Sequence, residues 1–432
     1  MSTAQAQVRR KRTEPGPRTG RGNRAGSGDA PGADRGAPPP AEPPANPAAK
    51  PAAGPAAGAR PAARAEPGPA AGRAQPAGRG PVVAITGAAR GLGHALTLRL
   101  AASPAARRVI AIDDHRGDVV GVTWRLADVR DPALAGRLTG VDVLVHTDVD
   151  MSADTEHRAR RAFNVRAAQT VLTAAAAGRV GRVILVTSAM VYGADPDNPV
   201  PLPEDAPLGL DRDGSVAGDL LEIEQLARRS PRSHPGMAIT VVRPAALVGE
   251  GVDTLITRHF EAPRLLTVKG CAPRWQFCHI EDLVSALELA VTGAISGAFA
   301  VGCDGWLEQD EVEELSGLRR IELPAGLTFG TVQRLHRIGI TPAPVSDLRY
   351  MVYPWVVDCR ALREAGWRPS YDNATALGVL LKQRTGHHAV AGRRLPRKEA
   401  TITAAGAAAG ATVAVIGTAA IVRAARRRKR GT

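Results

Sequence analysis

The sequence predicts an α/β fold, a doubly wound parallel sheet of the Rossmann type. From Pro81 onward, short runs rich in Val and Ile alternate with helical patterns. The apolar runs are continuous, which indicates strands buried on both faces. The helical stretches between them supply the crossovers that parallel strands require.

Six runs are interpreted as strands. In chain order they are PVVAITG from residue 81, RVIAIDD from 108, GVTWRLADV from 121, VDVLVHT from 141, GRVILVTSA from 181 and MAITVVRPAALV from 237. Crossover helices are expected over 91–102 and 154–178. After about residue 245 the pattern loosens into loops, a helix near 280–291 and the strand GAFAVGC. We interpret this part as a small cap on the substrate side, over the carboxyl ends of the strands, where such folds bind ligands.

The ends of the chain differ in composition from its middle. Residues 1–80 are almost entirely Ala, Pro, Gly and Arg without an aromatic side chain, so they cannot bury enough apolar surface to offset the entropy of ordering. We expect a disordered basic arm over 1–80, a Rossmann core over 81–245, a substrate-side region that completes the fold over 246–392, and an apolar tail with basic flanks over 393–432.

The formal net charge of +14 lies in the two ends. Residues 1–80 carry 13 Lys and Arg against 5 acids, and residues 393–432 carry 10 against 1, which leaves 33 against 36 in the middle. The basic arm could attract nucleic acid or anionic lipid. It has neither interleaved aromatics nor a recognisable binding module, so we favour a solvating tail and expect no nucleic-acid partner.

Residues 401–422 contain no charged side chain. As a helix they would run about 33 Å at 1.5 Å per residue, enough for a hydrocarbon core of about 30 Å. A transmembrane helix is therefore expected here, but the Ala, Gly and Thr content leaves a flexible linker or a surface-lying helix open. Gly406 and Gly410 form a G-x-x-x-G step that would let two such helices touch in a homodimer. In a segment so rich in Ala and Gly, this spacing also arises easily by chance.

Cysteine usage and the N-terminal stretch predict a cytoplasmic domain. The four cysteines show neither C-x-x-C spacing nor a nearby His pair, so we expect free thiols in a reducing compartment and no metal site. The stretch MSTAQAQVRRKR has no apolar run after it, which argues against a secretory signal. We expect a cytoplasmic domain held at the membrane by 401–422, although the basic residues on both flanks leave the sidedness of the tail open.

The stretch TGAARGLG predicts a dinucleotide site. It follows the first strand and opens the first helix. Gly87 permits the tight turn, and Gly91 and Gly93 allow a pyrophosphate and the first strand to approach the helix, whose N-terminal N–H groups favour an anion. Residues 81–245 are thus expected to form an NAD(P)-binding core.

Acidic residues after the second and third strands bear on the choice of cofactor. Asp113 and Asp114 end the second strand, where a carboxylate can bond an adenosine ribose and repel a 2′-phosphate. We therefore favour NAD over NADP, although Arg90 and Arg116 argue the other way. Asp128 would lie near the adenine, and it could equally cap the helix that follows.

Further motifs resemble the extended branch of the short-chain dehydrogenase/reductase superfamily, the NAD-dependent epimerases and dehydratases typified by UDP-glucose 4-epimerase. The resemblance covers roughly 81–385. Besides the glycine turn it rests on FNVRAAQTVLTAAAA, VILVTSAMVYG, EIEQLARR, VVRPAALVG, FCHIEDLVSAL and VVDCRALREAGWRPS. It implies a nicotinamide cofactor, a nucleotide-sugar substrate, a catalytic Ser188 and the cofactor-binding residues Thr86, Gly87, Arg90, Gly91, Leu92, Gly93, Asp113, Asp128, Val129, His146, Asn164 and Pro244.

The proton relay of that family is missing. The family uses a Tyr and a Lys four residues apart, with the Lys lowering the pKa of the Tyr. Counting back from Glu224 places Val216 at the Tyr position and Leu220 at the Lys position. No Tyr occurs between Tyr192 and Tyr350 and no Lys between Lys50 and Lys269, so a shift of register cannot restore the pair.

Other side chains could replace the lost base. Tyr192 is the nearest phenol, Asp148 stands where small residues normally line the nicotinamide side, and Asp219 and Glu222 lie near the empty relay. Each could equally be an ordinary structural or solvated group. On the substrate side Ala245, Ala246 and Leu247 replace the polar residues of nucleotide-sugar enzymes, and Arg274 lies one residue farther from Phe277 than the usual arginine.

The sequence is compatible with three functions. The chain could be a dinucleotide-binding sensor or scaffold at the membrane with impaired catalysis, an active epimerase, dehydratase or reductase that uses an unfamiliar base, or an anchoring protein without a cofactor. Loss of both relay residues removes an effect of about 10²- to 10⁴-fold, so we favour the first.

Overall fold

The computed structural model describes residues 80–152, 155–209, 214–324, 345–383, 387–390 and 393–396. Residues 1–79 of the arm predicted over 1–80, and the predicted span over 401–422, lie outside these residues. Within the described part of the chain, no helix is both long enough and apolar enough to cross a membrane.

The described residues form a seven-stranded parallel sheet with the order β11-β6-β5-β4-β1-β2-β3. Its strands are β1 (Val82–Thr86), β2 (Arg108–Asp113), β3 (Thr123–Leu126), β4 (Val143–His146), β5 (Arg182–Val186), β6 (Ala238–Pro244) and β11 (Ala298–Val301). The order of the first six strands is that of a Rossmann sheet, so the predicted fold class is confirmed.

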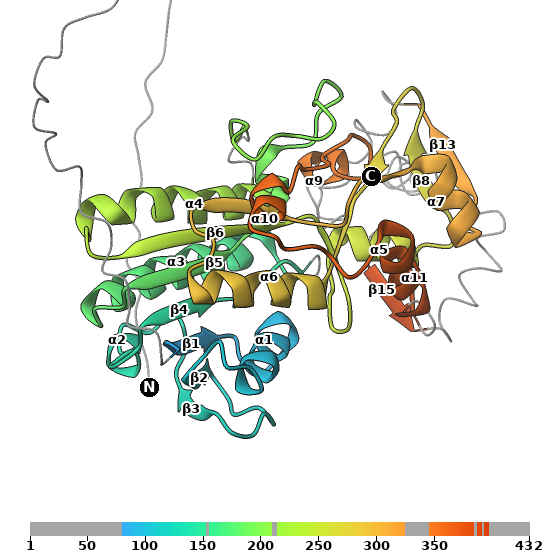
Figure 1. Ribbon diagram of the computed structural model, residues 1–432. Helices are drawn as coiled ribbons and strands as arrows, with labels where there is room; N and C mark the ends of the chain where they lie inside the picture. The colour runs from blue at the N-terminus through green and yellow to red at the C-terminus, as the bar shows by residue number, and fades with distance from the viewer. Residues whose placement is uncertain are drawn as a thin grey trace, which may run out of the picture. The chain divides into compact units, whose positions relative to one another are not determined.

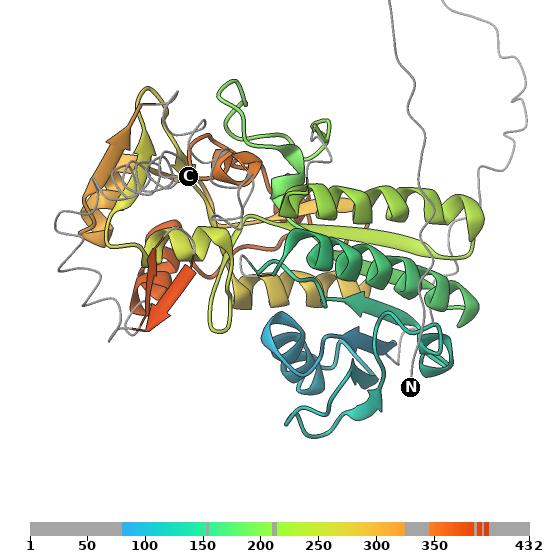
Figure 2. The same ribbon diagram turned by 180° about the vertical axis from the view of Figure 1, so that it is seen from behind.

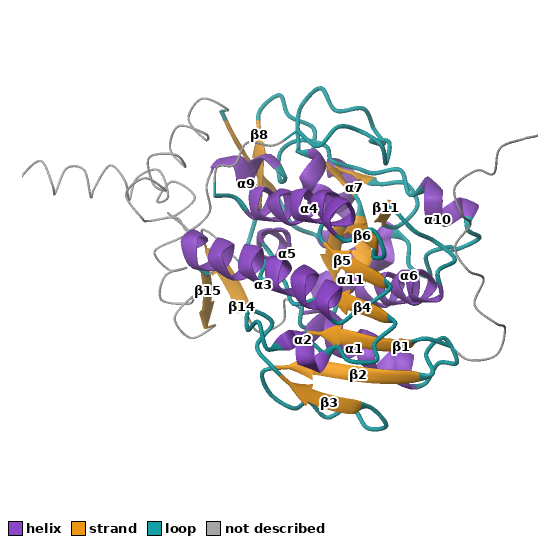
Figure 3. Ribbon diagram, turned by 90° about the vertical axis from the view of Figure 1, so that its left-hand side faces the viewer, coloured by secondary structure: helices purple, strands orange, loops and turns teal. Residues whose placement is uncertain are grey.

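Helices cover both faces of this sheet. Alternate residues of each strand point to opposite faces, and the buried side chains accordingly separate into two clusters. One contains side chains of α1 (Gly91–Ala101) and α6 (Ile280–Thr292), and the other contains those of α2 (Leu134–Arg137), α3 (His157–Ala177) and α4 (Val216–Ser233). Helices α3 and α4 lie side by side (Figures 1 and 2), and Figure 3 shows them across the central strands from α6.

Shorter elements complete the described residues beyond the sheet. They are η1 (Ala189–Tyr192), β7 (Ala246–Val248), α5 (Leu255–Glu261), β8 (Leu265–Val268), β9 (Arg274–Trp275), β10 (Phe277–His279), β12 (Leu307–Glu308), α7 (Gln309–Ser316), β13 (Arg320–Leu323), α9 (Val345–Arg349), α10 (Arg360–Glu364), α11 (Asn373–Gln383), β14 (His387–Val390) and β15 (Arg393–Pro396). Strand pairs β7 with β10, β8 with β13, β9 with β12 and β14 with β15 form small separate sheets.

Two details differ from the sequence interpretation. The run MAITVVRPAALV is not one strand, because β6 ends at Pro244 and β7 leaves the central sheet to pair with β10. The strand expected in the cap, β11, instead extends the central sheet beside β6, with Phe299 opposite Val242. Its fully buried Phe299 and Val301 explain this position, since both side chains belong to the core beneath the sheet.

Candidate functional site: a pocket at the carboxyl edge of the sheet

The glycine turn has the geometry of a close backbone approach. Gly87 and Gly91 have φ values of 71° and 51°, in the left-handed region that glycine adopts without strain. A Cβ atom on Gly93 would lie 2.0 Å from the carbonyl oxygen of Gly87. Helix α1 begins here without a side-chain cap or an acidic residue in its first turn. Its N-terminal N–H groups are therefore available to an anion, and the turn fits a dinucleotide pyrophosphate.

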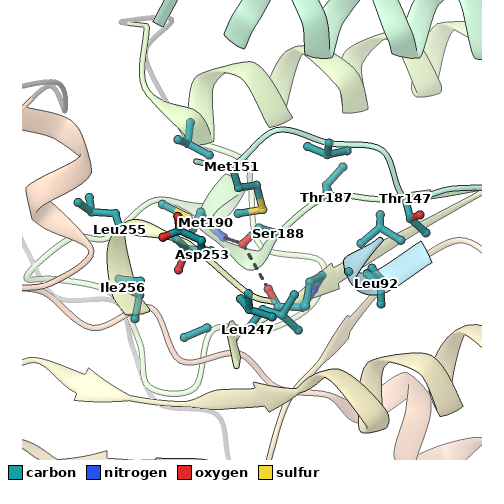
Figure 4. A pocket seen from close by; sticks show the side chains of 18 of the residues that line it. Leu92, Thr147, Met151, Thr187, Ser188, Met190, Leu247, Asp253, Leu255 and Ile256 are labelled. Carbon is teal, nitrogen blue, oxygen red and sulfur yellow. Dashed lines mark hydrogen bonds between the residues drawn. The ribbon is translucent and has the colours of Figure 1, made fainter. Parts of the chain in front are cut away.

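A pocket of about 250 Å³ opens beside this turn. Its lining residues come from the segments that follow β1, β4, β5 and β6, and from residues around α5, α9 and Trp355. Its lining comprises Gly87, Arg90, Gly91, Leu92, Thr147, Asp148, Val149, Met151, Arg160, Val186, Thr187, Ser188, Met190, Val216, Pro244, Ala245, Ala246, Leu247, Gly251, Val252, Asp253, Thr254, Leu255, Ile256, Asp347 and Trp355. The structure thus brings the glycine turn, Ser188 and Pro244 together in one lining. Figure 4 shows Ser188 near the middle of this pocket.

The side chain of Asp113 is hydrogen-bonded to the backbone of the glycine turn. Its buried carboxylate accepts hydrogen bonds from the backbone N–H of Ala89 at 2.9 Å and of Asp114 at 2.8 Å. The Arg90 guanidinium lies 3.6 Å from Asp113 and 3.5 Å from Asp114. A hydrogen bond from His115 holds the pKa of Asp114 below its usual range. The exposed Asp114 is therefore an ionised carboxylate beside the turn, while Arg116 lines a neighbouring groove.

Thr86 and His146 lie below the pocket and do not line it. They are opposite each other on β1 and β4, and the Thr86 hydroxyl and His146 Nδ1 are 2.7 Å apart in a hydrogen bond. Burial lowers the pKa of His146 to about 4, so the imidazole is neutral at physiological pH. In the structure this pair joins two strands that end at the pocket.

Asn164 holds the loop after β4. Its side-chain oxygen accepts from the backbone N–H of Asp150 at 2.8 Å, and its amide donates to the carbonyl of the same residue at 2.9 Å. Because this loop also carries Asp148 and Met151 into the pocket, Asn164 fixes part of the pocket wall.

Asp128 and Val129 lie outside the pocket lining. The Asp128 carboxylate accepts from the backbone N–H of Arg130 at 2.8 Å and from its guanidinium at 2.6 Å, and that contact lowers the pKa of Asp128. Val129 is buried in the core between the sheet and α3. Helix α2 has Ala133 at its N-cap and no side-chain cap, so the prediction that Asp128 caps this helix is wrong. Contact of Asp128 with an adenine stays a prediction.

Of Ser188 and the two positions that the sequence count assigns to the relay, Ser188 and Val216 line the pocket and Leu220 does not. Ser188 lines the pocket, donates to the Pro244 carbonyl at 3.3 Å and accepts from the Met190 N–H at 3.2 Å (Figure 4). Val216, the first residue of α4, also lines the pocket. Leu220, one turn later, is fully buried in the core beside α3. Both positions that the count from Glu224 assigns to the relay thus carry hydrocarbon side chains, and that assignment stays a prediction.

Three of the suggested substitute bases form hydrogen bonds or ion pairs with other groups of the protein. Asp219 and Arg160 form a buried ion pair at 2.9 Å, and burial raises the pKa of Asp219 while Arg160 opposes that shift. Glu222 pairs with Arg161 at 2.7 Å. The Tyr192 hydroxyl donates to the carbonyl of Glu204, and burial raises its pKa.

Asp148 differs from the other three. It lines the pocket, and its Cβ would lie 3.0 Å from a Cβ on Gly87. Burial raises the pKa of Asp148 to about 6, and the carboxylates of Asp113, Asp114 and Asp128 act in the same direction against the opposing charge of Arg90. This is a carboxyl group that titrates near neutral pH against the turn where a pyrophosphate would bind.

Asp148→Asn should remove a pH dependence of NAD binding. The ionised carboxylate repels a pyrophosphate, so in the wild-type protein we expect affinity to fall about tenfold as the pH rises through the Asp148 pKa of about 6. Because burial raises this pKa above that of the unfolded chain, the free energy of unfolding should also decrease as the pH rises from about 4 to about 6. Asp148→Asn should therefore be more stable than the wild type at neutral pH. Calorimetric titration and thermal unfolding across this pH range test both expectations.

Asp197→Asn is the matched control, because Asp197 is exposed and outside the pocket lining. It should keep the wild-type pH profile. An unchanged profile in Asp148→Asn would show that this carboxylate does not face the bound dinucleotide.

Several pocket residues were not singled out from the sequence. Arg160 could have been, because it lies four residues before Asn164 and so shares its helix face. Nothing in the sequence distinguishes Met190 from the other apolar residues that follow Ser188. No recognisable pattern marks the segments that contain Trp355 and the start of α5. Conversely, Arg274 bonds to Glu308 at 2.9 Å, stacks over Trp306 and lies outside the lining.

Comparison with known proteins agrees with this geometry. The model of the NAD dependent epimerase/dehydratase family matches residues 83–302. An uncharacterized protein of Mycobacterium tuberculosis (strain ATCC 25618 / H37Rv) is 30% identical over 316 residues, which cover 70% of this chain and 84% of the relative. An uncharacterized protein of Mycobacterium bovis gives the same values. The chain therefore belongs to the NAD dependent epimerase/dehydratase family.

Solved structures share the fold. MoeE5 in complex with UDP-glucuronic acid and NAD is 22% identical with a TM-score of 0.54, covering 70% of this chain and 99% of that one. The UDP-glucose 4-epimerase of Thermus thermophilus, in complex with NAD, is 17% identical with a TM-score of 0.54, covering 71% and 99%. These similarities identify a common architecture.

Proposed function

We propose that this chain binds NAD at the glycine turn and acts as a dinucleotide-binding sensor or scaffold, without the proton relay of its family. Family membership, the fit of the turn to a pyrophosphate and the NAD in the names of similar structures support the cofactor. The single observation that carries the loss of the relay is Val216, a hydrocarbon side chain that lines the pocket together with Ser188. The exposed Asp114 favours NAD over NADP, since a carboxylate beside the ribose repels a 2′-phosphate.

The test begins with the purified full chain. Bound nucleotide is released by denaturation and identified, and NAD, NADH and NADP are titrated by calorimetry. We expect NAD or NADH to bind and NADP to bind more weakly. With a panel of nucleotide sugars, we expect little or no conversion of bound NAD to NADH. Absence of heat with every nicotinamide nucleotide would overturn the proposal.

A second function rests on Asp148. A carboxyl group with a pKa of about 6 at the pocket is suited to act as a general base. In that case the chain would be an active epimerase, dehydratase or reductase. Turnover that survives in Ser188→Ala and is lost in Asp148→Asn, with NAD binding retained in both, would support this function over the first.

Membrane attachment through residues 401–422 and self-association remain part of the proposal. Both are tested by comparing the full chain with a chain that ends at residue 400, in vesicle flotation and in sedimentation. Loss of flotation on truncation supports the anchor, and flotation that persists would assign membrane binding to another part of the chain.

A further inference from the structure

The end of the pocket away from the glycine turn is lined mainly with hydrocarbon, with the Asp253 carboxylate among the apolar side chains. Figure 4 shows Leu255 and Ile256 at the opposite end from Leu92 and Thr147, with Ser188 and Met190 between them. Met151, Leu247, Val252 and Trp355 also belong to this lining. A ligand that extends from Ser188 toward α5 would therefore contact apolar side chains along most of its length.

The polar atoms of this wall are bonded within the protein. Trp355 Nε1 donates to the Tyr350 carbonyl at 2.9 Å, and the Tyr350 hydroxyl donates to the Met190 carbonyl at 2.7 Å. Through Tyr350, these two bonds connect Trp355 to Met190 of η1. The wall thus presents the Trp355 ring and the Met190 side chain as a preformed apolar surface.

Charged side chains in the described lining do not offer this end a cation for a phosphate. Asp253 accepts two hydrogen bonds of 2.7 Å from Arg258, whose side chain is 1% exposed and lies outside the lining. Arg160 donates to Asp219 and to the Gly214 carbonyl. The remaining charged members are Arg90 at the glycine turn and the acids Asp148 and Asp347.

A nucleoside diphosphate would be poorly accommodated by these groups. Its pyrophosphate is anionic, and burying an anion without a cation or donors costs several kcal/mol. Nearby acids add repulsion, and Arg274 is bonded to Glu308 outside the lining. An uncharged apolar ligand meets neither cost and gains about 0.8 kcal/mol per buried methylene.

We propose that this end of the pocket binds an uncharged, largely apolar small molecule that offers an oxygen atom to Ser188, and that it excludes nucleoside diphosphates. This inference rests on the proposed function, because it assumes that a bound NAD fills the other end of the pocket. It adds the class of the second ligand. The Ser188 hydroxyl lies in the middle of the lining, bonded to the Pro244 carbonyl at 3.3 Å and to the Met190 N–H at 3.2 Å. The neighbouring Asp253 carboxylate accepts two bonds from Arg258.

A homologous series tests the ligand class directly. Cyclohexanone and its 4-methyl, 4-ethyl and 4-propyl derivatives are titrated into the full chain, with and without saturating NADH, and binding is measured by calorimetry. We expect affinity to increase up to about fourfold per added methylene. UDP and UDP-glucose should bind at least tenfold more weakly than 4-propylcyclohexanone. 4-Propylcyclohexylamine tests whether the pocket acids instead select a cation.

Leu255→Ala and Leu266→Ala provide a matched pair of variants. Both leucines are half-buried, but Leu255 lines the pocket whereas Leu266 lies on β8 outside it. Leu255→Ala should weaken 4-propylcyclohexanone binding about fivefold or more and leave NADH binding intact, and Leu266→Ala should change neither by more than about twofold.

The outcomes separate this proposal from the proposed function. Failure of NADH to bind, with the ketone series still graded by length, would overturn the dinucleotide function alone. NADH binding together with tight UDP-glucose binding, preference for the amine, or no dependence on chain length would overturn the apolar ligand alone. Equal loss of ketone binding in both leucine variants would show that the ligand does not occupy this pocket.

Discussion

Gly93→Ala should abolish NAD binding, lowering affinity by at least about 100-fold. The added methyl group would lie 2.0 Å from the Gly87 carbonyl oxygen, 2.6 Å from its carbonyl carbon and 2.6 Å from Thr147 Oγ1. The first two contacts are with backbone, so α1 must move away from the turn. That movement displaces the N–H groups that would face the pyrophosphate. We also expect a loss of stability of about 1–3 kcal/mol, because overpacking forces backbone shifts.

Gly378→Ala is the matched control for this prediction. Gly378 lies within α11, and a Cβ there meets nothing within 4 Å. Alanine in the interior of a helix is favoured over glycine by about 0.5–1 kcal/mol, so this variant should be as stable as the wild type or more so and bind NAD unchanged. Calorimetry and thermal unfolding measure both properties. A Gly93→Ala protein that binds NAD normally would remove the turn as the cofactor site.

The sequence was a good guide to the sheet, because its strands are continuous apolar runs separated by helical crossovers. The expected helices over 91–102, 154–178 and 280–291 correspond to α1 (Gly91–Ala101), α3 (His157–Ala177) and α6 (Ile280–Thr292). The place of β11 was not predictable in the same way. Its partner β6 lies more than fifty residues earlier, and that pairing depends on tertiary contacts that no local pattern contains.

The site was predictable only where spacing or turn chemistry constrained it. Counting from Glu224 assigned Val216 to the relay, which stays a prediction, and Val216 does line the pocket, since helical spacing fixes one residue relative to another. Contacts between distant segments could not be predicted from the sequence, which left Tyr192 and Asp219 open as bases. In the structure Tyr192 bonds to the Glu204 carbonyl and Asp219 pairs with Arg160, so both have structural roles. The apolar wall around α5 and Trp355 likewise assembles from distant segments.

Glu224, the reference point of that count, also has a physical role. Its buried carboxylate accepts from Arg243 Nε at 2.9 Å and Nη2 at 2.6 Å, and from the Thr187 hydroxyl at 2.9 Å. Thr187 precedes Ser188 at the end of β5, and Arg243 precedes Pro244 at the end of β6. The middle of α4 is thereby bonded to the ends of both strands.

Val216→Tyr combined with Leu220→Lys should create redox activity. A phenol at position 216 would enter the pocket beside Ser188, and an ammonium group one helical turn away would lower its pKa, so that it can accept a proton near neutral pH. We expect conversion of NAD to NADH with 4-propylcyclohexanol to rise at least about 100-fold above the wild-type rate. NADH absorbance measures the reaction. The fully buried Leu220 site makes some loss of stability unavoidable.

Val216→Phe combined with Leu220→Met is the control for side-chain size. Phe and Met are nearly as large as Tyr and Lys, but neither can transfer a proton. It should bind NAD and remain inactive. Equal activity in the two double variants would show that packing, not acid–base chemistry, limits the wild-type protein. A folded Tyr and Lys variant that binds NAD and the apolar alcohol without turnover would mean that the phenol does not reach Ser188, so the assignment of position 216 to the relay would be wrong.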